Sequence, residues 1–371
     1  MGAALGLLWK LEPATAAKHQ LYKRYLDAWW PIMLQPLPPS GYERPRVTYV
    51  DAFAGPGIYK LGEDGSPIFA IDRLLKHTAF PRMNVTRDRV TMLFIERDAS
   101  RCEHLLQLIV SRFGPLDGLP MRVCVRQGDA GVDTERYLSD LGAWDAPILA
   151  IFDSWGNVNT PFGLVRRIAK AKSSEVITTF GPNWFSRRER MNPGQLDEVF
   201  GGNEFWQPAQ REDRPDERWR AWLEIYRRSL KRAGFDYQLQ FEVVPRTGLP
   251  LFLVYGTGND KGVDVMKDAM WTVDGSEGMG FRDPRTRGAA PVGQLDLFHD
   301  SRREDELTEL LMQRLASGPS TVDELGKWLL CETARWRRKH AREAIIKMRD
   351  AGLVEVAPAG RVTAKSHVSA R

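Results

Sequence analysis

The sequence is poor in the features that define several protein classes. Its three cysteines are too few and too scattered for a disulfide framework or a zinc site. It has no run of about 18 apolar residues, so we expect no membrane span. It also lacks a Gly-Lys-Ser/Thr sequence, which excludes a phosphate-binding P-loop. The apolar start lacks the basic residues of a signal peptide, and we expect a cytoplasmic protein without a metal site.

What is present predicts a large and a small domain. The 371 residues exceed the roughly 250–300 at which a single hydrophobic core stops growing. Short apolar runs alternate with amphipathic stretches, which is typical of a parallel sheet covered by helices on both faces. The expected elements are a first helix at Ala16–Leu34, strands at Val47–Phe53, Val90–Ile95, Met121–Val125, Ile148–Phe152 and Val176–Phe180, and an antiparallel edge hairpin of Tyr237–Val244 and Leu251–Tyr255.

The domain boundaries follow from this pattern. Residues 1–45 are expected to form a helical cover, and residues 46–273 an α/β Rossmann domain with a helical insertion at about 183–232. A Gly-, Pro- and Arg-rich linker occupies 274–302. Residues 303–371 are expected to form three helices and a small hairpin, which is the layout of a winged helix.

The C-terminal domain is basic. Residues 301–371 hold 14 Lys and Arg against 10 Asp and Glu, and the whole chain has a formal net charge of +5. Arg335, Arg337 and Arg338 cluster at the start of the third expected helix, where such a module contacts DNA. The alternative is that the cluster packs on the first domain or on a partner.

Carboxylates and glycines recur where the expected parallel strands end, which is the edge at which open α/β sheets bind ligands. Asp51, Phe53, Gly55 and Gly57 follow the first strand. Glycine lets the backbone approach a ligand and adopt a positive φ angle. The second strand ends at Glu96, where a carboxylate is placed to accept both hydroxyls of a ribose.

The next two strands continue the series. Asp129 follows the third strand, in place for an adenine edge, and Asp153-Ser154-Trp155-Gly156 follows the fourth, facing the group to be modified. Each carboxylate alone has an ordinary alternative as a helix cap, but four in register favour a ligand site. The first turn lacks the three glycines that bind a pyrophosphate, so the pattern favours S-adenosylmethionine over a dinucleotide.

These residues resemble a known family, the three-Cys-motif partner (TcmP) proteins of bacteria, which have a methyltransferase-like Rossmann domain and commonly a winged-helix-like tail. The resemblance covers most of residues 10–275 and is carried by Ala17-Lys-His-Gln-Leu-Tyr-Lys-Arg-Tyr-Leu-Asp-Ala-Trp, Asp51-Ala-Phe-Ala-Gly-Pro-Gly with Gly65-Ser-Pro, Phe94-Ile-Glu-Arg-Asp, the Asp153 turn and Gly262-Val-Asp-Val-Met-Lys-Asp-Ala-Met-Trp. It implies an S-adenosylmethionine-dependent methyltransferase fold and a radical-S-adenosylmethionine-like partner protein with three cysteines.

One position departs from the family pattern. Ser154 stands where the family has a proline, in a sequence similar to the Asp-Pro-Pro-Tyr/Phe of amino-methyltransferases. In those enzymes the carboxylate and a backbone carbonyl hold the target amine, and the aromatic ring, at the position of Trp155 here, stacks on the base. Proline fixes φ and helps to aim the neighbouring carbonyl, so its loss bears on how an amine is positioned.

Other residues are candidates for substrate contact, each with a structural alternative. Lys18 and His19 on the first helix either cover the cofactor or substrate, or belong to a solvated helical face. Trp184 with Arg187 combines a stacking ring with phosphate-binding charge, or else packs an inserted helix.

A short motif in the linker adds a further candidate partner. Gln294, Leu295, Leu297 and Phe298 resemble the peptide that docks bacterial replication and repair proteins on the sliding clamp; the alternative is that these apolar residues anchor the linker. The leading hypothesis from sequence is a methyltransferase acting on a base amine of nucleic acid. The alternative is a non-catalytic adaptor for the three-Cys-motif protein or the clamp.

Overall fold

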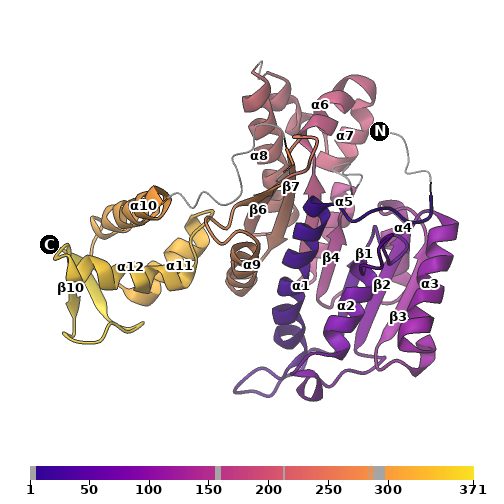
Figure 1. Cartoon of the computed structure of the whole chain (residues 1–371), viewed down its shortest axis with the longest axis horizontal. Helices are drawn as coiled ribbons and strands as arrows, with labels where there is room; N and C mark the ends of the chain where they lie inside the picture. Colours follow the sequence, from indigo (N-terminus) through magenta and orange to yellow (C-terminus); the bar gives the residue numbers. More distant parts are fainter. Residues whose placement is uncertain (1–5, 155–159, 212–213, 284, 287–296) are drawn as a thin grey trace.

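The computed structural model describes residues 6–154, 160–211, 214–283, 285–286 and 297–371. A sheet of eight strands lies at the centre of the larger unit, in the order β3-β2-β1-β4-β5-β7-β6-β8 (Figure 1). The strands are β1 (Val47–Asp51), β2 (Val90–Glu96), β3 (Arg122–Gln127), β4 (Ile148–Phe152), β5 (Glu175–Phe180), β6 (Tyr237–Val244), β7 (Leu251–Thr257) and β8 (Gly280–Arg282).

The pairing of the strands confirms the predicted methyltransferase-like Rossmann fold. β1 pairs in parallel with β2 on one side and β4 on the other, and β5 continues the parallel set. β7 runs antiparallel between β5 and β6, which confirms the antiparallel hairpin, but β8 pairs in parallel with β6 and forms the outer edge. Every residue of β1, β4 and β5 is buried, as expected for strands covered on both faces.

Helices cover both faces of the sheet (Figure 1). On one face lie α1 (Pro13–Leu34), α2 (Ser66–Leu75), α3 (Ala99–Phe113) and α9 (Asp260–Val273). On the other lie α4 (Val132–Asp140), α5 (Phe162–Lys170) and the inserted helices α6 (Pro182–Met191), α7 (Pro193–Phe200) and α8 (Pro215–Ala233). Four short 3₁₀ turns complete this unit at Phe80–Arg82, Leu116–Gly118, Asn203–Phe205 and Gln207–Arg211.

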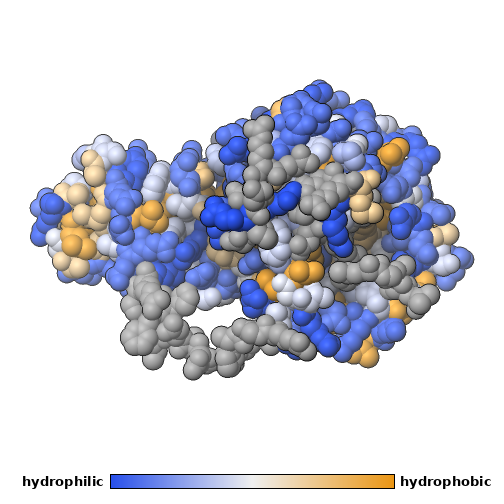
Figure 2. Space-filling view, turned by 90° about the horizontal axis from the view of Figure 1, so that it is seen from above, coloured by the Kyte–Doolittle hydropathy of each residue, from blue (hydrophilic) through white to orange (hydrophobic). Residues whose placement is uncertain are grey.

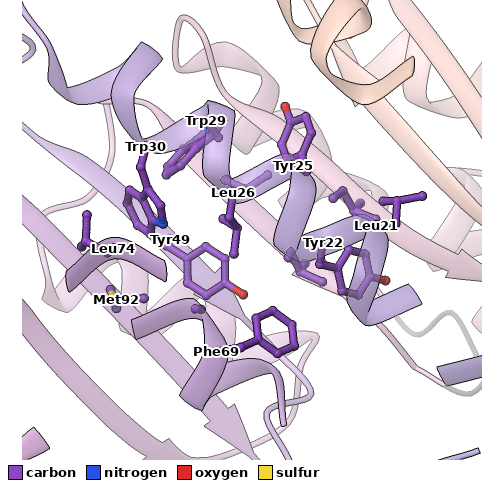
Figure 3. Close-up of a cluster of buried hydrophobic side chains, with 14 of the residues drawn as sticks. Leu21, Tyr22, Tyr25, Leu26, Trp29, Trp30, Tyr49, Phe69, Leu74 and Met92 are labelled. Atoms are coloured by element: carbon purple, nitrogen blue, oxygen red, sulfur yellow. The ribbon is translucent and has the colours of Figure 1, made fainter. Parts of the chain in front are cut away.

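Helix α1 is anchored by large apolar side chains. It begins three residues before the predicted Ala16, with Pro13 in the first turn, where proline costs no hydrogen bond. Tyr22, Tyr25, Trp29 and Trp30 are at most 2% exposed, and Trp30 packs against Tyr49 of β1 with 6.0 Å between ring centroids (Figure 3). Burial of each such side chain stabilises the fold by about 2 kcal/mol, so the helix holds its polar residues in fixed places.

The C-terminal unit has its own core and lies beside α9 (Figure 1). Its elements are α10 (Leu297–Leu315), β9 (Ser320–Thr321), α11 (Val322–Glu332), α12 (Arg338–Asp350), β10 (Val354–Ala357) and β11 (His367–Ala370), with the sheet order β10-β11-β9. Helix α11 begins with a capping box, in which the Thr321 side chain accepts from the Glu324 amide and the Glu324 side chain accepts from the Thr321 amide. Part of the range predicted as linker is structured, because β8 and the start of α10 fall within it.

The surface offers no continuous apolar face in the view of Figure 2. Hydrophobic residues are scattered over a largely hydrophilic surface there. The most exposed large apolar side chains, Leu61, Val132 and Met191, belong to separate parts of the chain. Single exposed apolar residues of this kind are normal for soluble domains.

Candidate functional site

A cavity of about 60 Å³ lies at the carboxyl ends of β1 and β4. Its lining includes Lys18 and His19 from α1, the turn Gly55–Gly57 after β1, and Asp153 after β4. Parallel strands bring their carboxyl ends to one edge of a sheet, and the first turns of α1 reach the cavity there. The structure therefore brings together three groups of residues that the sequence pointed to separately.

The turn after β1 needs its glycines. Gly55 and Gly57 have φ angles of 63° and 84°, as predicted. A Cβ on Gly57 would lie 2.7 Å from Leu105 Cδ1, and one on Gly65 would lie 2.9 Å from the backbone of Gly57. Gly65 also donates its amide to the Gly57 carbonyl at 2.7 Å. The two backbone segments thus pack directly on each other, and the turn presents bare backbone to the cavity.

Asp51 lies beneath this turn and is only 1% exposed. Its Oδ1 accepts a hydrogen bond from the Phe53 amide at 3.2 Å, while Oδ2 is buried without a donor in hydrogen-bonding geometry among the described residues. Burial raises the pKa of Asp51 to about 7 against the effect of nearby Ser66 and the Phe53 amide, and the carboxylates of Asp153 and Glu96 raise it further. A cationic group beside Oδ2 would relieve this cost.

Glu96 holds the glycine turn from the next strand. Its Oε2 accepts from the Gly55 amide at 3.0 Å and its Oε1 from the Asp98 amide at 2.9 Å. Asp129 is exposed and does not line the cavity; its Oδ1 accepts from the Gly131 amide at 2.8 Å, near the start of α4. Glu96 therefore supports the glycine turn and does not itself line the cavity, and its contact with a ribose stays a prediction; Asp129 accepts a hydrogen bond within its own turn.

Asp153 is held by three donors from two elements. Lys18 Nζ lies 2.5 Å from Oδ1, Thr179 Oγ1 donates to Oδ1 at 2.5 Å, and Tyr22 OH donates to Oδ2 at 3.0 Å. Burial by itself would raise the pKa of Asp153, but the Lys18 ammonium and these hydrogen bonds hold it below its ordinary value. The carboxylate is thus ionised and aimed, and it acts as an acceptor of hydrogen bonds rather than as a base.

The residues after Asp153 are less fully described. Ser154 is 4% exposed, and its hydroxyl has no hydrogen-bond partner in the part of the chain that the structure describes. The predicted contact of Trp155 lies outside the described residues.

His19 is neutral at pH 7. Burial, together with the charge of Lys18, lowers its pKa to about 3 despite the opposing effect of Asp153. Its ring packs on Phe69, with 5.1 Å between centroids, and its Nε2 lies 3.4 Å from the Tyr59 hydroxyl. Both predicted α1 residues, Lys18 and His19, therefore face the cavity and are not part of a solvated helical face.

Several residues at the site were not foreseen from sequence. Trp9 lines the cavity beside Gly55, its carbonyl accepts from the Lys60 amide at 3.0 Å, and Arg101 lies over its ring at 4.8 Å. Tyr22 and Thr179 orient Asp153. The signal for Tyr22 was present, since it lies one helical turn after Lys18, but a tyrosine in an apolar stripe is typical of a core.

The two candidate residues in the inserted helix α6 have different environments. Trp184 packs against the hydrophobic core, with its ring edge-on to Phe185 at 4.7 Å between centroids. Arg187 is exposed. For Trp184 the packing alternative given above describes the structure better than a stacking platform does.

The basic cluster of the C-terminal unit lies at the joint with α9. Arg337 pairs with Asp268 at 3.0 Å, Arg338 with Asp260 at 3.6 Å, and Arg335 with Glu306 at 3.1 Å. Packing on the first domain, the alternative to DNA contact, is therefore what the structure shows for Arg337 and Arg338. Arg335 is also drawn in, because its carbonyl accepts from the indole of Trp271 at 2.9 Å.

Lys267 of α9 is the buried centre of this joint, and sequence reasoning missed it. Its Nζ reaches four carbonyl oxygens at the end of α11 and beyond it: Leu330 at 2.7 Å, Thr333 at 2.6 Å, Trp336 at 2.8 Å and Leu329 at 3.4 Å. Burial lowers its pKa to about 7, while the carbonyl oxygens favour the ammonium.

The clamp-like motif falls mostly outside the described residues. Gln294 and Leu295 are not described, and Leu297 and Phe298 begin α10. Among the helices that the structure describes, none is long and apolar enough to cross a membrane. No group of three or more His, Cys, Asp or Glu suited to a metal ion occurs within those same ranges.

Comparison with known proteins gives distant likenesses. No family model and no curated protein matches the chain. Solved structures similar to it include Trm1 from Pyrococcus horikoshii with S-adenosyl-L-methionine, at 10% identity over 71% of this chain and 61% of that one, with a TM-score of 0.36. The N-terminal domain of EvdMO1 with SAH bound matches at 14% identity over 70% of this chain and 86% of that one, with a TM-score of 0.34.

A putative O-methyltransferase from Klebsiella pneumoniae is similar to the same degree, at 12% identity over 66% of this chain and 88% of that one, with a TM-score of 0.32. The chain thus spans about three fifths of the length of Trm1. Likenesses at these scores do not bear on activity, and the functional argument depends on the site itself.

Proposed function

We propose that the protein is an S-adenosylmethionine-dependent methyltransferase of the TcmP family. One observation carries the proposal: the bare glycine turn after β1 and the oriented carboxylate after β4 line a single cavity. In an open α/β sheet this is the place where a ligand and its reaction partner meet.

The residues present fit the cofactor. Side chains on Gly57 or Gly65 would collide with Leu105 or with backbone, so the cradle accepts only glycine. Oδ2 of Asp51, which has no donor in hydrogen-bonding geometry among the described residues, suits a cationic group. Asp51, Glu96 and the turn would hold the cofactor, which supplies a methyl group on a positively charged sulfonium for transfer to a nucleophile.

The other residues of the cavity position the acceptor. Thr179 and Tyr22 fix the carboxylate of Asp153, so that it accepts a hydrogen bond from an acceptor N–H in one direction. His19, although neutral, is a weak base because of its low pKa. The protein therefore contributes mainly alignment and charge, which is the larger part of what methyl transfer requires.

Entry of the cofactor requires the segment that carries Trp9 to move. Pockets for ligands of this size measure about 300–1,000 Å³, whereas the cavity measures about 60 Å³. Trp9 lies over Gly55. Within the described residues its carbonyl accepts from the Lys60 amide, and its ring contacts Arg101 and meets Tyr59 edge-on at 6.2 Å between centroids. Because Trp9 lies at the edge of the site, we propose that this segment is the gate.

We further propose that the acceptor is an amine of nucleic acid. The support is the net charge of +5 and the exposed Lys339 and Arg342 on α12, which remain on the surface after the arginines of the joint are used. The second candidate is an adaptor for the three-Cys-motif protein or the clamp. It is favoured by Ser154, which stands where the family that the chain resembles has a proline beside the carboxylate.

Transfer of labelled methyl groups separates the two functions. The purified protein is incubated with methyl-labelled S-adenosylmethionine and, in turn, with DNA, RNA and the three-Cys-motif protein. Label in nucleic acid that is lost in Asp153→Ala supports the methyltransferase. Absence of label from all three acceptors, with the cofactor bound, supports the adaptor.

A further inference from the structure

The three donors on Asp153 differ in kind. Thr179 and Tyr22 are short or rigid side chains on β5 and α1, and they hold the carboxylate from within the fold. Lys18 instead reaches Oδ1 with the end of a long, flexible side chain, of which only 8% is exposed. Its ammonium lies at the wall of the cavity that also contains the glycine turn.

We infer that Lys18 occupies the acceptor-amine position, so that the Asp153 carboxylate is an ammonium- and amine-binding subsite filled by the chain's own amine until an acceptor replaces it. This inference rests on the proposed function, because only a methyltransferase has an acceptor to bind here. Lys18 then competes with the acceptor for Asp153, and the acceptor belongs to the class of groups with N–H donors.

The charges around the cavity support a site for a cation. Asp153 lies in the cavity, Asp51 beneath the turn and Glu96 beside it, whereas Lys18 is the formal positive charge that faces Asp153. His19 adds no charge because it is neutral. When the Lys18 side chain leaves, the buried carboxylate loses its counter-charge and one hydrogen-bond donor. An aliphatic ammonium restores both, and a neutral amine restores the donor.

The geometry also limits what can bind. A carboxylate can accept about four hydrogen bonds, and Thr179 and Tyr22 each donate one to Asp153. Two acceptor positions remain, and Lys18 occupies one of them. An incoming amine with two N–H groups fits that arrangement. A hydroxyl acceptor brings only one donor, and it would leave one acceptor site of the carboxylate unused.

A chemical-rescue experiment tests this without any cofactor. Lys18→Ala removes Cγ, Cδ, Cε and Nζ, which are the heavy atoms of propylamine. We expect propylamine to raise the melting temperature of Lys18→Ala and to bind it at least about 10-fold more tightly than 1-propanol, because hydrogen bonds to a charged group are the strong ones. Wild type, with its subsite filled, should not respond.

The control variant tests whether the negative charge of Asp153 is what binds the amine. The double variant Lys18→Ala/Asp153→Asn keeps the space but lacks the charge, and propylamine should leave its melting temperature unchanged. If Lys18→Ala does not fold alone, recovery of folded protein on refolding with propylamine but not with propanol gives the same answer. Equal effects of amine and alcohol, or recovery with neither, would overturn the inference.

The outcome of the rescue experiment can be distinguished from the outcome of the cofactor-binding test. Failure of the protein to bind S-adenosylhomocysteine would remove the methyltransferase proposal and leave the amine subsite standing. A failed rescue in a protein that does bind the cofactor would remove only the role of Lys18.

Discussion

Replacement of Asp51 by asparagine should stabilise the protein at alkaline pH. Asp51 is a buried carboxylate whose Oδ2 has no cationic partner in the part of the chain that the structure describes, and burial raises its pKa from 3.8 to about 7. A folded-state pKa above the unfolded value means that the folded protein binds the proton more tightly. This group's contribution to stability is therefore fully present below about pH 4 and is lost as the pH rises to 7 and above.

The magnitude follows from the same numbers. A rise of the pKa from 3.8 to about 7 corresponds to about 4 kcal/mol of lost stability above pH 7. Asparagine removes the charge but brings an amide that lacks a full set of partners, which costs about 1–3 kcal/mol. The net gain at pH 8 is then about 1–3 kcal/mol, or a few degrees of melting temperature for a unit of this size.

Thermal unfolding of wild type and Asp51→Asn at pH 5 and pH 8 measures this. Asp88→Asn is the matched control, because the side chain of Asp88 is 99% exposed and its charge costs little. The variant should gain stability relative to wild type on going from pH 5 to pH 8, and the control should not. An advantage of Asp51→Asn that is equal at both pH values, or absent, would refute the reasoning. The gain in stability should come with weaker binding of the cofactor.

Three further perturbations test other parts of the account. Gly57→Ala, with φ at 84° and Leu105 2.7 Å from the new Cβ, should abolish cofactor binding in titration calorimetry; Gly118→Ala, which meets no atom within 4 Å, should not. Lys267→Met should destabilise the joint by about 3 kcal/mol, because it leaves buried carbonyls unpaired, and the C-terminal unit should be released faster in limited proteolysis; a rate equal to that of wild type would contradict this. Trp9→Ala should speed association of S-adenosylhomocysteine in stopped flow, and an unchanged rate would show that Trp9 is not the gate.

Sequence predicted the sheet well because its central strands are buried on both faces. The range Ile148–Phe152 is identical in sequence-based and observed strands, and β1 and β5 differ by at most two residues. Such strands read as continuous apolar runs, which local pattern alone identifies. β8 was missed because three residues at the edge of a sheet, within a stretch rich in Gly and Pro, carry no periodic signal.

The site was predicted in parts that only the fold could join. Lys18 and Asp153 are 135 positions apart, and nothing local indicates that they form an ion pair. The basic cluster misled in the opposite way. The position of Arg337 at the start of a helix is typical of a DNA contact, but in the fold Arg337 forms an ion pair with Asp268 of α9. A count of charges along the chain does not reveal which of them face another part of the same protein.

Binding of S-adenosylhomocysteine is the decisive measurement for the proposed methyl-donor site. Titration calorimetry is done with wild type and with the double variant Asp51→Ala/Glu96→Ala, after both have been shown to melt cooperatively. The account predicts binding by wild type in the micromolar range, and a loss of at least about 100-fold in the double variant, since both carboxylates support the turn that cradles the ligand. No binding by wild type, or equal binding by both proteins, would contradict the account.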